Sequence, residues 1–464
     1  MYGTEGSSTR LIAEKGDGIM SNNKETPYWS AVETMSQEEL QNLQFRRLVR
    51  LLKYLQLNSV FYRDRLASSG TSYQDVKSLD DIAKLPFTTK QDIVNSAEKP
   101  GYIYGELFCG DPKNVLRWHK TSGTTGKPIK IADTMEDWNS YSDLSAEALY
   151  AMGIRKEDIV VVAFGYGPFI AFWTYIAGLE RIGATFIPSG SLDTQGRIEL
   201  VKDFGATVFM SVPSYAIHLG ETARAIGTDL AKHSTIRLVV HTGEPTTPLM
   251  KKKIEELWGA RQMERIGSTE TGGFAFECPE SPGIYHIQEG FLIAELINPA
   301  NDERVELGDE GELVLTPLYR KGMPLLRFKT GNLVKSAKEA RCRCGRNYLS
   351  LEGTDHGIVI RRLDKLLKIR GVLIDPIAIE NTVRQFEGFG EEYRILFEKK
   401  GEMDEIKVQV ELKNKVELKN IENARINLME ELKRKLMIRI DVEFIPFGKL
   451  ARFEEKAKRV IDLR

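Results

Sequence analysis

The sequence predicts an α/β fold: a large N-terminal domain with parallel sheets covered by helices, followed by a small, mobile α+β lid domain. Between residues 159 and 267, apolar β-rich runs alternate with segments of helical pattern, which is typical of a parallel sheet covered by helices. Beyond about residue 364, short strands flank highly charged helices, which indicates a separate compact module. The 464 residues are enough for both parts.

The elements are expected in a definite order. In the large domain, strands are predicted at 159–164, 184–188, 206–210 and 236–241, and helices at 169–181, 195–204, 215–225 and 248–258. In the second module, strands are predicted at 392–398, 405–412 and 438–444, and helices at 376–385 and 418–436. We therefore divide the chain into a disordered tail (1–26), an N-terminal domain (27–363) and a C-terminal lid (364–464).

One uncharged stretch, residues 159–179, is long enough to suggest a membrane span. Gly165, Gly167 and Pro168 interrupt its centre, so we interpret it as a buried strand, a turn and a buried helix. The first 26 residues have no apolar core of the kind that a signal peptide needs. No membrane partner is therefore expected.

Charge and cysteine content exclude other classes of protein. Lys and Arg total 65 against 66 Asp and Glu, a balance that argues against a nucleic-acid partner. The 4 cysteines are too few for a disulfide scaffold, which favours a reducing compartment such as the cytoplasm.

A loop rich in glycine and hydroxyl groups follows the predicted start of the large domain. It reads Thr121, Ser122, Gly123, Thr124, Thr125, Gly126 and Lys127, followed by Pro128. Hydroxyls, free main-chain N–H groups and a lysine on a backbone made pliable by glycine suit a polyphosphate. The spacing is not that of a Walker P-loop, which needs four residues between its glycine and the Gly-Lys pair. Taken alone, a flexible surface turn is an equal alternative.

Further segments follow this loop in a fixed order: 266–270, 327–332, 362–371 and 455–460. With the loop, they resemble the motifs of adenylate-forming enzymes, and most of all those of the phenylacetate–CoA ligase branch. The resemblance runs from about Tyr28 to the C-terminus. It implies that ATP activates a carboxylic acid as an acyl-adenylate, and that CoA then takes the acyl group while AMP leaves.

The resemblance also implies a role for each segment. Residues 121–127 would hold the β- and γ-phosphates of ATP, and Gly243, Glu244 and Pro245 would line the adenine. Ile266, Gly267 and Ser268 lead to Thr269, which would contact the α-phosphate, and to Glu270, which would help hold Mg²⁺. For Glu270 alone, a carboxylate at a helix start is the simpler interpretation. Lys456 would neutralise charge at the α-phosphate as the carboxylate attacks.

Asn332 departs from the family pattern, which usually has Asp accepting bonds from both ribose hydroxyls. Asn offers one carbonyl acceptor and an NH₂ donor, so it loses a charge-assisted bond but can still hold the ribose. The alternative is that Gly331 and Asn332 only form a turn. Arg362 would contact ribose or phosphates and Asp364 would be the hinge between the domains, unless this charged segment is only a solvated link.

Three of the cysteines cluster with a histidine in a regular structural zinc set: Cys278, His286, Cys342 and Cys344. The spacing of Cys342 and Cys344 is tighter than the common C-x₂-C, so three reduced cysteines packed in loops remain the alternative. A structural role is expected for the zinc.

Aromatic residues are expected to line the acid pocket: Phe164, Tyr166, Phe169, Pro213 and Tyr215. They suit a flat apolar acid, although each is as readily explained as core. The run after Gly167 is bulkier than in the resembling branch, which favours an aryl acid of another shape, or a small acyl acid, over phenylacetate itself.

The sequence leaves several points open. The acyl acceptor can be CoA or another group, such as an amine, a carrier protein or a cofactor hydroxyl. A non-catalytic relative on the same scaffold is the third reading, which Asn332 favours and Lys456 and Glu270 oppose. The acid and the oligomeric state are not determined, and a homodimer is one option.

Overall fold

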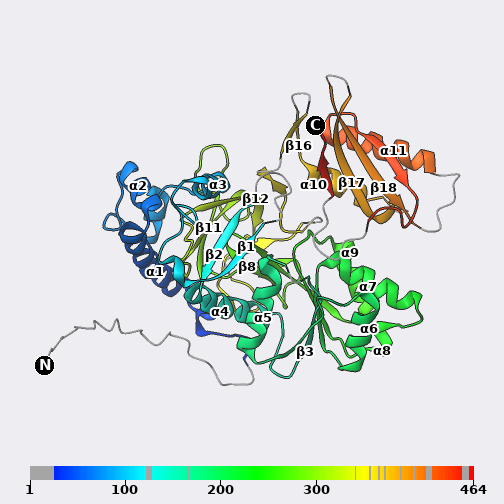
Figure 1. Cartoon of the computed structure of the whole chain (residues 1–464), viewed down its shortest axis with the longest axis horizontal. Helices are drawn as coiled ribbons and strands as arrows, with labels where there is room; N and C mark the ends of the chain where they lie inside the picture. Colours follow the sequence, from blue (N-terminus) through cyan, green and yellow to red (C-terminus); the bar gives the residue numbers. More distant parts are fainter. Residues whose placement is uncertain are drawn as a thin grey trace.

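The structure is a computed structural model that describes residues 26–121, 128–165, 167–339, 341–354, 357–363, 366–369, 372–386, 389–400, 403–413, 421–451 and 459–464. Figure 1 shows a large body that contains most of the chain and a smaller body that carries the C-terminus. The large body combines a long sheet with helices, and the smaller one has its own sheet and helices. The predicted α/β architecture with a smaller C-terminal part is confirmed.

The parallel part of the large sheet comes from the alternating region. Its strands lie side by side in the order β4 (Thr185–Pro188), β3 (Ile159–Val162), β5 (Val208–Ser211), β6 (Leu238–His241) and β7 (Arg261–Ser268). The intervening helices are α5 (Ile170–Ile182), α6 (Thr194–Asp203), α7 (Pro213–Ala225), the short α8 (Leu230–His233) and α9 (Pro248–Trp258). Every predicted strand and helix of this region is present, because strands covered on both faces read as continuous apolar runs.

The sheet continues beyond β7 with antiparallel strands that the sequence analysis did not predict. They are β8 (Gly272–Glu277), β9 (Ile284–Ile287), β13 (Ser350–Glu352), β12 (Phe328–Ser336), β11 (Glu310–Pro317) and β10 (Leu292–Ile297), with β14 (Arg361–Arg362) paired to β12. Strand β7 is thus parallel to β6 on one side and antiparallel to β8 on the other.

Other helices pack around this sheet, and Figure 1 shows the first of them at one end of the large body. They are α1 (Gln37–Asn58), α2 (Val60–Ser68), α3 (Lys90–Glu98) and α4 (Met135–Ala151), with short 3₁₀ turns at Ala31–Thr34, Leu79–Lys84 and Pro112–Asn114. Helix α4 packs closely on α5, since a Cβ at Gly178 would lie 2.7 Å from that of Ser145. In the described residues, no helix has the length and apolar character needed to cross a membrane.

The C-terminal module, residues 366–464, has its own sheet in the order β19-β18-β17-β20. Its strands are β17 (Phe389–Lys400), β18 (Met403–Leu412), β19 (Asp441–Ile445) and β20 (Val460–Asp462). Its helices are α10 (Pro376–Arg384) and α11 (Ile421–Leu436). A hairpin of β15 (Leu367–Ile369) and β16 (Val372–Ile374) precedes these elements. Phe397, Val408 and Leu428 belong to a core of its own. The predicted strands and helices of this module are present.

A small hairpin of β1 (Val115–Lys120) and β2 (Lys130–Thr134) lies beside the large sheet. Asp133 of β2 is fully buried and pairs with Arg320, which follows β11 (Glu310–Pro317) and is also fully buried. The second Nη of Arg320 donates to the main-chain carbonyl of Glu270. One guanidinium therefore joins the hairpin to the turn after β7.

We expect Arg320→Met to lower the free energy of unfolding by about 3–5 kcal/mol, because it leaves the Asp133 carboxylate buried without its partner. Replacing both partners, in Arg320→Met with Asp133→Leu, is expected to recover part of that loss. Urea unfolding followed by fluorescence measures both.

Lys321→Met is the matched control for this experiment. Lys321 pairs with Glu136 at the surface, where the two side chains are 48% and 62% exposed, so its loss should cost less than about 1 kcal/mol. Equal effects of Arg320→Met and Lys321→Met would contradict the assigned role of Arg320.

Candidate functional site

Four of the predicted site residues directly follow parallel strands, at their carboxyl ends. Phe164 follows β3, Pro213 follows β5, Glu244 follows β6 and Thr269 follows β7. Neighbouring pairs among these strands are parallel, so their carboxyl ends face the same side. In open α/β sheets ligands bind in the crevice beyond this edge.

The loop predicted to line the adenine is fixed by hydrogen bonds on both sides. Glu244 is buried, and its Oε2 accepts from the main-chain N–H of Ser214 at 3.2 Å, which joins the loops after β5 and β6. Gly243 has a φ of 90°, a conformation that glycine adopts without strain. Thr242 Oγ1 donates to the Arg265 carbonyl at 2.6 Å, which holds the start of the loop against β7.

A buried polar network that includes Glu264 contacts the same loop through Thr246. Thr246 Oγ1 donates to Glu264 Oε1 at 3.2 Å, and Tyr285 donates to Glu264 Oε2 at 2.7 Å. Lys251 Nζ lies 3.6 Å from Glu264 and 2.8 Å from Glu277. Burial raises the pKa of the Glu264 carboxyl to about 7, against the opposing charge of Lys251. The loop after β6, which is predicted to line the adenine, is therefore anchored to a buried network.

The two ends of the hydroxyl-rich loop are joined by hydrogen bonds between Thr121 and Ile129. The Thr121 N–H donates to the Ile129 carbonyl at 2.9 Å, and Thr121 Oγ1 accepts from the Ile129 N–H at 2.9 Å. The N–H of Lys120 donates to the Pro168 carbonyl at 3.0 Å, which places the hairpin beside the loop after β3. Residues 122–127, the predicted phosphate contacts, lie outside the described residues.

His119 lies on β1 just before this loop. Its ring is buried, its centroid lies 5.9 Å from that of Trp138, and its Nε2 lies 3.6 Å from Asp133 Oδ2. Burial lowers the pKa of His119 despite the Asp133 carboxylate. The hairpin below the loop thus carries a neutral imidazole at neutral pH.

Thr269 and Glu270 occupy the turn between β7 and β8. The alternative that Glu270 sits at a helix start is therefore wrong. The chain instead reverses into β8, where Gly267 pairs with Gly273 and Ser268 pairs with Gly272. A Cβ at Gly267 would lie 2.9 Å from the Gly272 carbonyl, so the close approach of the strands requires glycine. Ser268 Oγ accepts from the Thr271 N–H at 3.1 Å and closes the turn.

Asn332 lies within β12, so the alternative that it only forms a turn is also wrong. Residue 332 pairs with Arg362 of β14. The Asn332 side chain is buried, and its Oδ1 has no hydrogen-bond partner among the described residues. A buried carbonyl oxygen without a donor costs about 1–3 kcal/mol, so this atom fits a ligand hydroxyl that donates to it.

Residues 357–362 connect β12 to the loop after β6. A Cβ built on Gly357 would lie 3.5 Å from the main-chain N of Thr246. The Ile360 N–H donates to the Leu333 carbonyl at 2.9 Å. The groups predicted to hold adenine and ribose are thus linked by one short segment.

The predicted pocket residues differ in how far they are buried. Phe164 and Tyr215 belong to the core of the parallel sheet; Phe164 stacks on Tyr175 at 5.6 Å, and the Tyr215 hydroxyl meets Thr194 Oγ1 at 3.2 Å. Pro213 is buried at the first turn of α7. Phe169 is half-buried, and its ring lies 3.1 Å from the position of a Cβ on Gly167.

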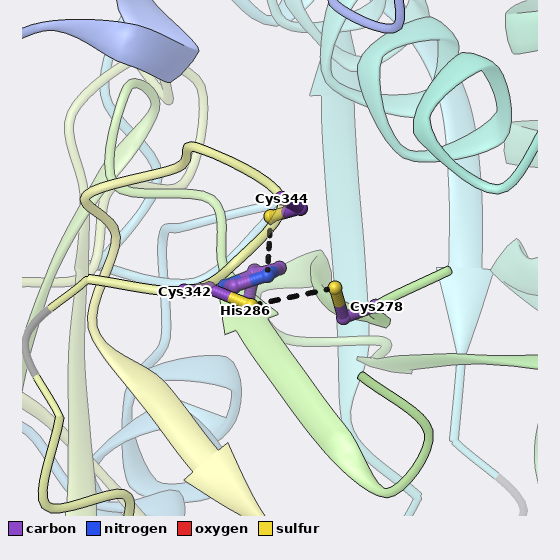
Figure 2. Close-up of side chains that lie close together, drawn as sticks. All are labelled: Cys278, His286, Cys342 and Cys344. Atoms are coloured by element: carbon purple, nitrogen blue, oxygen red, sulfur yellow. Dashed lines mark hydrogen bonds between the residues drawn. The ribbon is translucent and has the colours of Figure 1, made fainter. Parts of the chain in front are cut away.

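The structure brings the predicted metal ligands together. Figure 2 shows Cys278, His286, Cys342 and Cys344 converging from three segments of the chain. Their ligand atoms all lie within 4.8 Å of one another. The Sγ atoms of Cys278 and Cys342 are 3.6 Å apart, and Cys344 Sγ lies 3.2 Å from His286 Nε2.

Three further predicted site residues lie outside the described ranges, and one buried ion pair at the site was not predicted from the sequence. Tyr166, Asp364 and Lys456 lie outside the described residues. The sequence analysis assigned no role to Asp133 or Arg320. No local motif marks this pair, because its members lie in different segments that only the fold brings together.

Comparisons with known proteins show the family of this chain. The family model of the AMP-binding enzymes matches residues 88–316, and that of the AMP-binding enzyme C-terminal domain matches residues 371–464. The phenylacetate–coenzyme A ligase of Escherichia coli (strain K12) is 33% identical over 439 residues, covering 93% of this chain and 97% of the relative. That of Thermus thermophilus is 31% identical, covering 94% and 99%.

Solved structures show the same fold. A crystal structure of 2-hydroxyisobutyryl-CoA ligase in the postadenylation state, in complex with R3-HIB-AMP, has a TM-score of 0.84 at 28% identity, covering 95% of this chain and 94% of that one. The same ligase with 2-HIB-AMP and CoA in the thioesterification state has a TM-score of 0.71 at 29% identity, covering 95% and 93%. The chain therefore belongs to the AMP-binding family of adenylate-forming enzymes, in which its relatives include the phenylacetate–coenzyme A ligases.

Proposed function

We propose that this protein is an AMP-forming acid–CoA ligase that uses ATP to activate a carboxylic acid. The observation that carries the proposal is the buried Asn332 Oδ1, which has no partner among the described residues and lies on the strand next to Arg362. A ribose hydroxyl supplies the missing donor. Residues 357–362 link this atom to the loop of Glu244 that follows β6, where the adenine is expected.

The reaction has two steps. A carboxylate oxygen of the acid attacks the α-phosphorus of ATP, and the bond to the bridging oxygen of the β-phosphate breaks, which releases pyrophosphate. The sulfur of CoA then attacks the carbonyl carbon of the acyl-adenylate, loses its proton, and displaces AMP.

Several residues have proposed roles in these steps. Thr269 contacts the α-phosphate, and residues 121–127 hold the β- and γ-phosphates. Glu270 supplies a carboxylate oxygen to Mg²⁺, which offsets phosphate charge when bound. Arg320 positions this turn by holding the Glu270 carbonyl. Lys456, from the C-terminal module, stabilises charge at the α-phosphate, and the module pivots near Asp364.

The acid is proposed to be aromatic, with a short branched acid as the second candidate. Aromatic side chains around the turn after β3 support an apolar acid. Trp173 Nε1 donates to the Gly167 carbonyl at 3.1 Å, and Phe169 packs on the same glycine, so bulky groups brace this turn. The names of the relatives support both candidates, since they are phenylacetate–coenzyme A and 2-hydroxyisobutyryl-CoA ligases.

A structural zinc in the Cys278 cluster is a further part of the proposal. Tetrahedral Zn²⁺ with Zn–S bonds of about 2.3 Å separates its ligands by about 3.7 Å, and Cys278 and Cys342 are 3.6 Å apart. The second ring nitrogen of His286 meets Ser350 Oγ at 3.0 Å, which orients the imidazole as in zinc sites. Such reduced thiols suit a cytoplasmic protein.

The cluster also fixes the first described segment of the chain. Tyr28 donates to the Cys344 carbonyl at 2.6 Å, and buried Arg346 pairs with buried Glu33 at 2.6 Å. The proposed zinc therefore stabilises the loop around Cys344 and, through it, residues 28–33.

The activity is tested with ATP, Mg²⁺ and a panel of aryl and short branched acids, with and without CoA. We expect pyrophosphate release with at least one acid and a CoA thioester only when CoA is present. Lys456→Ala should abolish pyrophosphate release while the circular dichroism spectrum stays unchanged.

Two outcomes would contradict the ligase. Pyrophosphate release without any thioester would indicate an adenylating enzyme with another acceptor. ATP binding without pyrophosphate release for any acid would indicate a non-catalytic relative.

The ribose contact gives a second prediction. Asn332→Asp should tighten ATP binding about fivefold, because a carboxylate accepts charge-assisted hydrogen bonds that are about 1 kcal/mol stronger than those of an amide. Asn332→Leu removes the acceptor and should weaken binding about tenfold. Isothermal titration with ATP in the absence of acid measures both, and equal affinities of the two variants would exclude Asn332 from the ribose site.

The zinc gives a third prediction. Metal analysis of the purified protein should find about one zinc per chain, and Cys278→Ser should lose it and lower the melting temperature by about 5 °C or more. Cys109→Ser is the control, since Cys109 is also a buried free cysteine but lies outside the cluster. Absence of zinc together with normal stability of Cys278→Ser would refute the site.

A further inference from the structure

The C-terminal module contacts the nucleotide loop through a buried ion pair. Arg459 Nη1 lies 3.8 Å from Glu244 Oε1, and the two side chains are only 9% and 4% exposed. Arg459 directly precedes β20, whereas Glu244 follows β6 of the large body. The pair therefore spans the two bodies at the edge where the nucleotide is proposed to bind.

Each partner is held firmly on its own side. Glu244 Oε2 accepts from the Ser214 N–H at the start of α7. Arg459 Nη2 lies 3.3 Å from Glu392 Oε2 within the module, and its guanidinium carbon lies 5.2 Å from the Tyr393 ring centroid. Because neither side chain is free to follow its partner, the contact depends on how the two bodies are placed.

The comparison structures indicate which placement this is. Two structures of 2-hydroxyisobutyryl-CoA ligase in the postadenylation state have TM-scores of 0.84, whereas those in the thioesterification state and in an open conformation have 0.71. All four cover 95% of this chain, so coverage does not account for the difference. This structure is therefore more similar overall to the postadenylation state than to the other two.

We propose that Arg459 and Glu244 form a latch that holds the C-terminal module in this arrangement and opens before CoA attacks. The inference rests on the proposed two-step reaction. Turning the module away would take the Arg459 guanidinium from the buried Glu244 carboxylate while Arg459 keeps Glu392, so the latch favours one arrangement over any in which the module has turned away. Both are positioning residues: they act on the reaction through the place of the module.

The test separates the two half-reactions. Arg459→Met should slow single-turnover acyl-adenylate formation about tenfold, a typical size for coupling between distant elements. Thioester formation from supplied acyl-adenylate and CoA should stay within about twofold of the wild-type rate or increase. Arg459→Lys keeps the charge and should restore part of the first rate.

Two further variants control for damage to either body. Arg434→Met removes another cation of the module, one that pairs with Glu431 on the surface of α11, so the ratio of the two half-reaction rates should stay at the wild-type value. In a double-mutant cycle, Glu244→Gln with Arg459→Met should slow adenylate formation no more than the stronger single variant.

Hydrogen exchange gives a readout that does not depend on activity. Arg459→Met should speed exchange at the peptide around Glu244 and at the start of α7, with β17 and β18 unchanged. If the wild-type protein has no ligase activity but Arg459→Met still produces this change in exchange, the proposed function is rejected and the latch is kept. Equal loss of both half-reactions, or no change in either rate or exchange, would overturn the latch.

Discussion

The buried guanidinium of Arg320 is the contact that joins the β1–β2 hairpin to the turn after β7, the two elements proposed to hold the phosphates. It reaches the Asp133 carboxylate on β2 and the Glu270 carbonyl after β7, so it fixes the hairpin that carries residues 122–127 relative to the turn that carries Thr269. Such a buried pair adds little net stability, since desolvation offsets most of the attraction. Its value lies in geometry, because either charge left alone in the interior would be costly.

The other side of the site is organised by the loop after β6. Glu244 receives the N–H of Ser214 with one oxygen and faces Arg459 with the other. Thr246 anchors the far end of the loop to the buried Glu264. This loop is therefore fixed on the side of the large sheet and also contacts the C-terminal module. In the proposed reaction, nucleotide binding and module position would be linked through Glu244.

The cysteine cluster connects different segments of the chain from those at the carboxyl edge of the parallel strands. Cys278 and His286 come from the antiparallel part of the large sheet, and Cys342 and Cys344 from the loop before β13. Tyr28 and Glu33 attach the first described residues to this loop. The proposed zinc would therefore link the antiparallel part of the sheet to the loop before β13 and, through that loop, to the first described residues.

The sequence by itself determined the parallel strands, their helices and the C-terminal module, because apolar periodicity is a local signal. It also predicted that Cys278, His286, Cys342 and Cys344 lie together, because residue type alone marks a zinc set; the roles of Asn332 and Glu244 stay predictions. Only the tertiary structure showed that Asn332 Oδ1 is buried with no hydrogen-bond partner among the described residues, that Glu270 sits in a hairpin turn, and that the strands after β7 run antiparallel. The pairs Arg320 with Asp133 and Arg459 with Glu244 also needed the fold. Their partners are far apart in the chain, so only burial and distance in three dimensions make these charges meet.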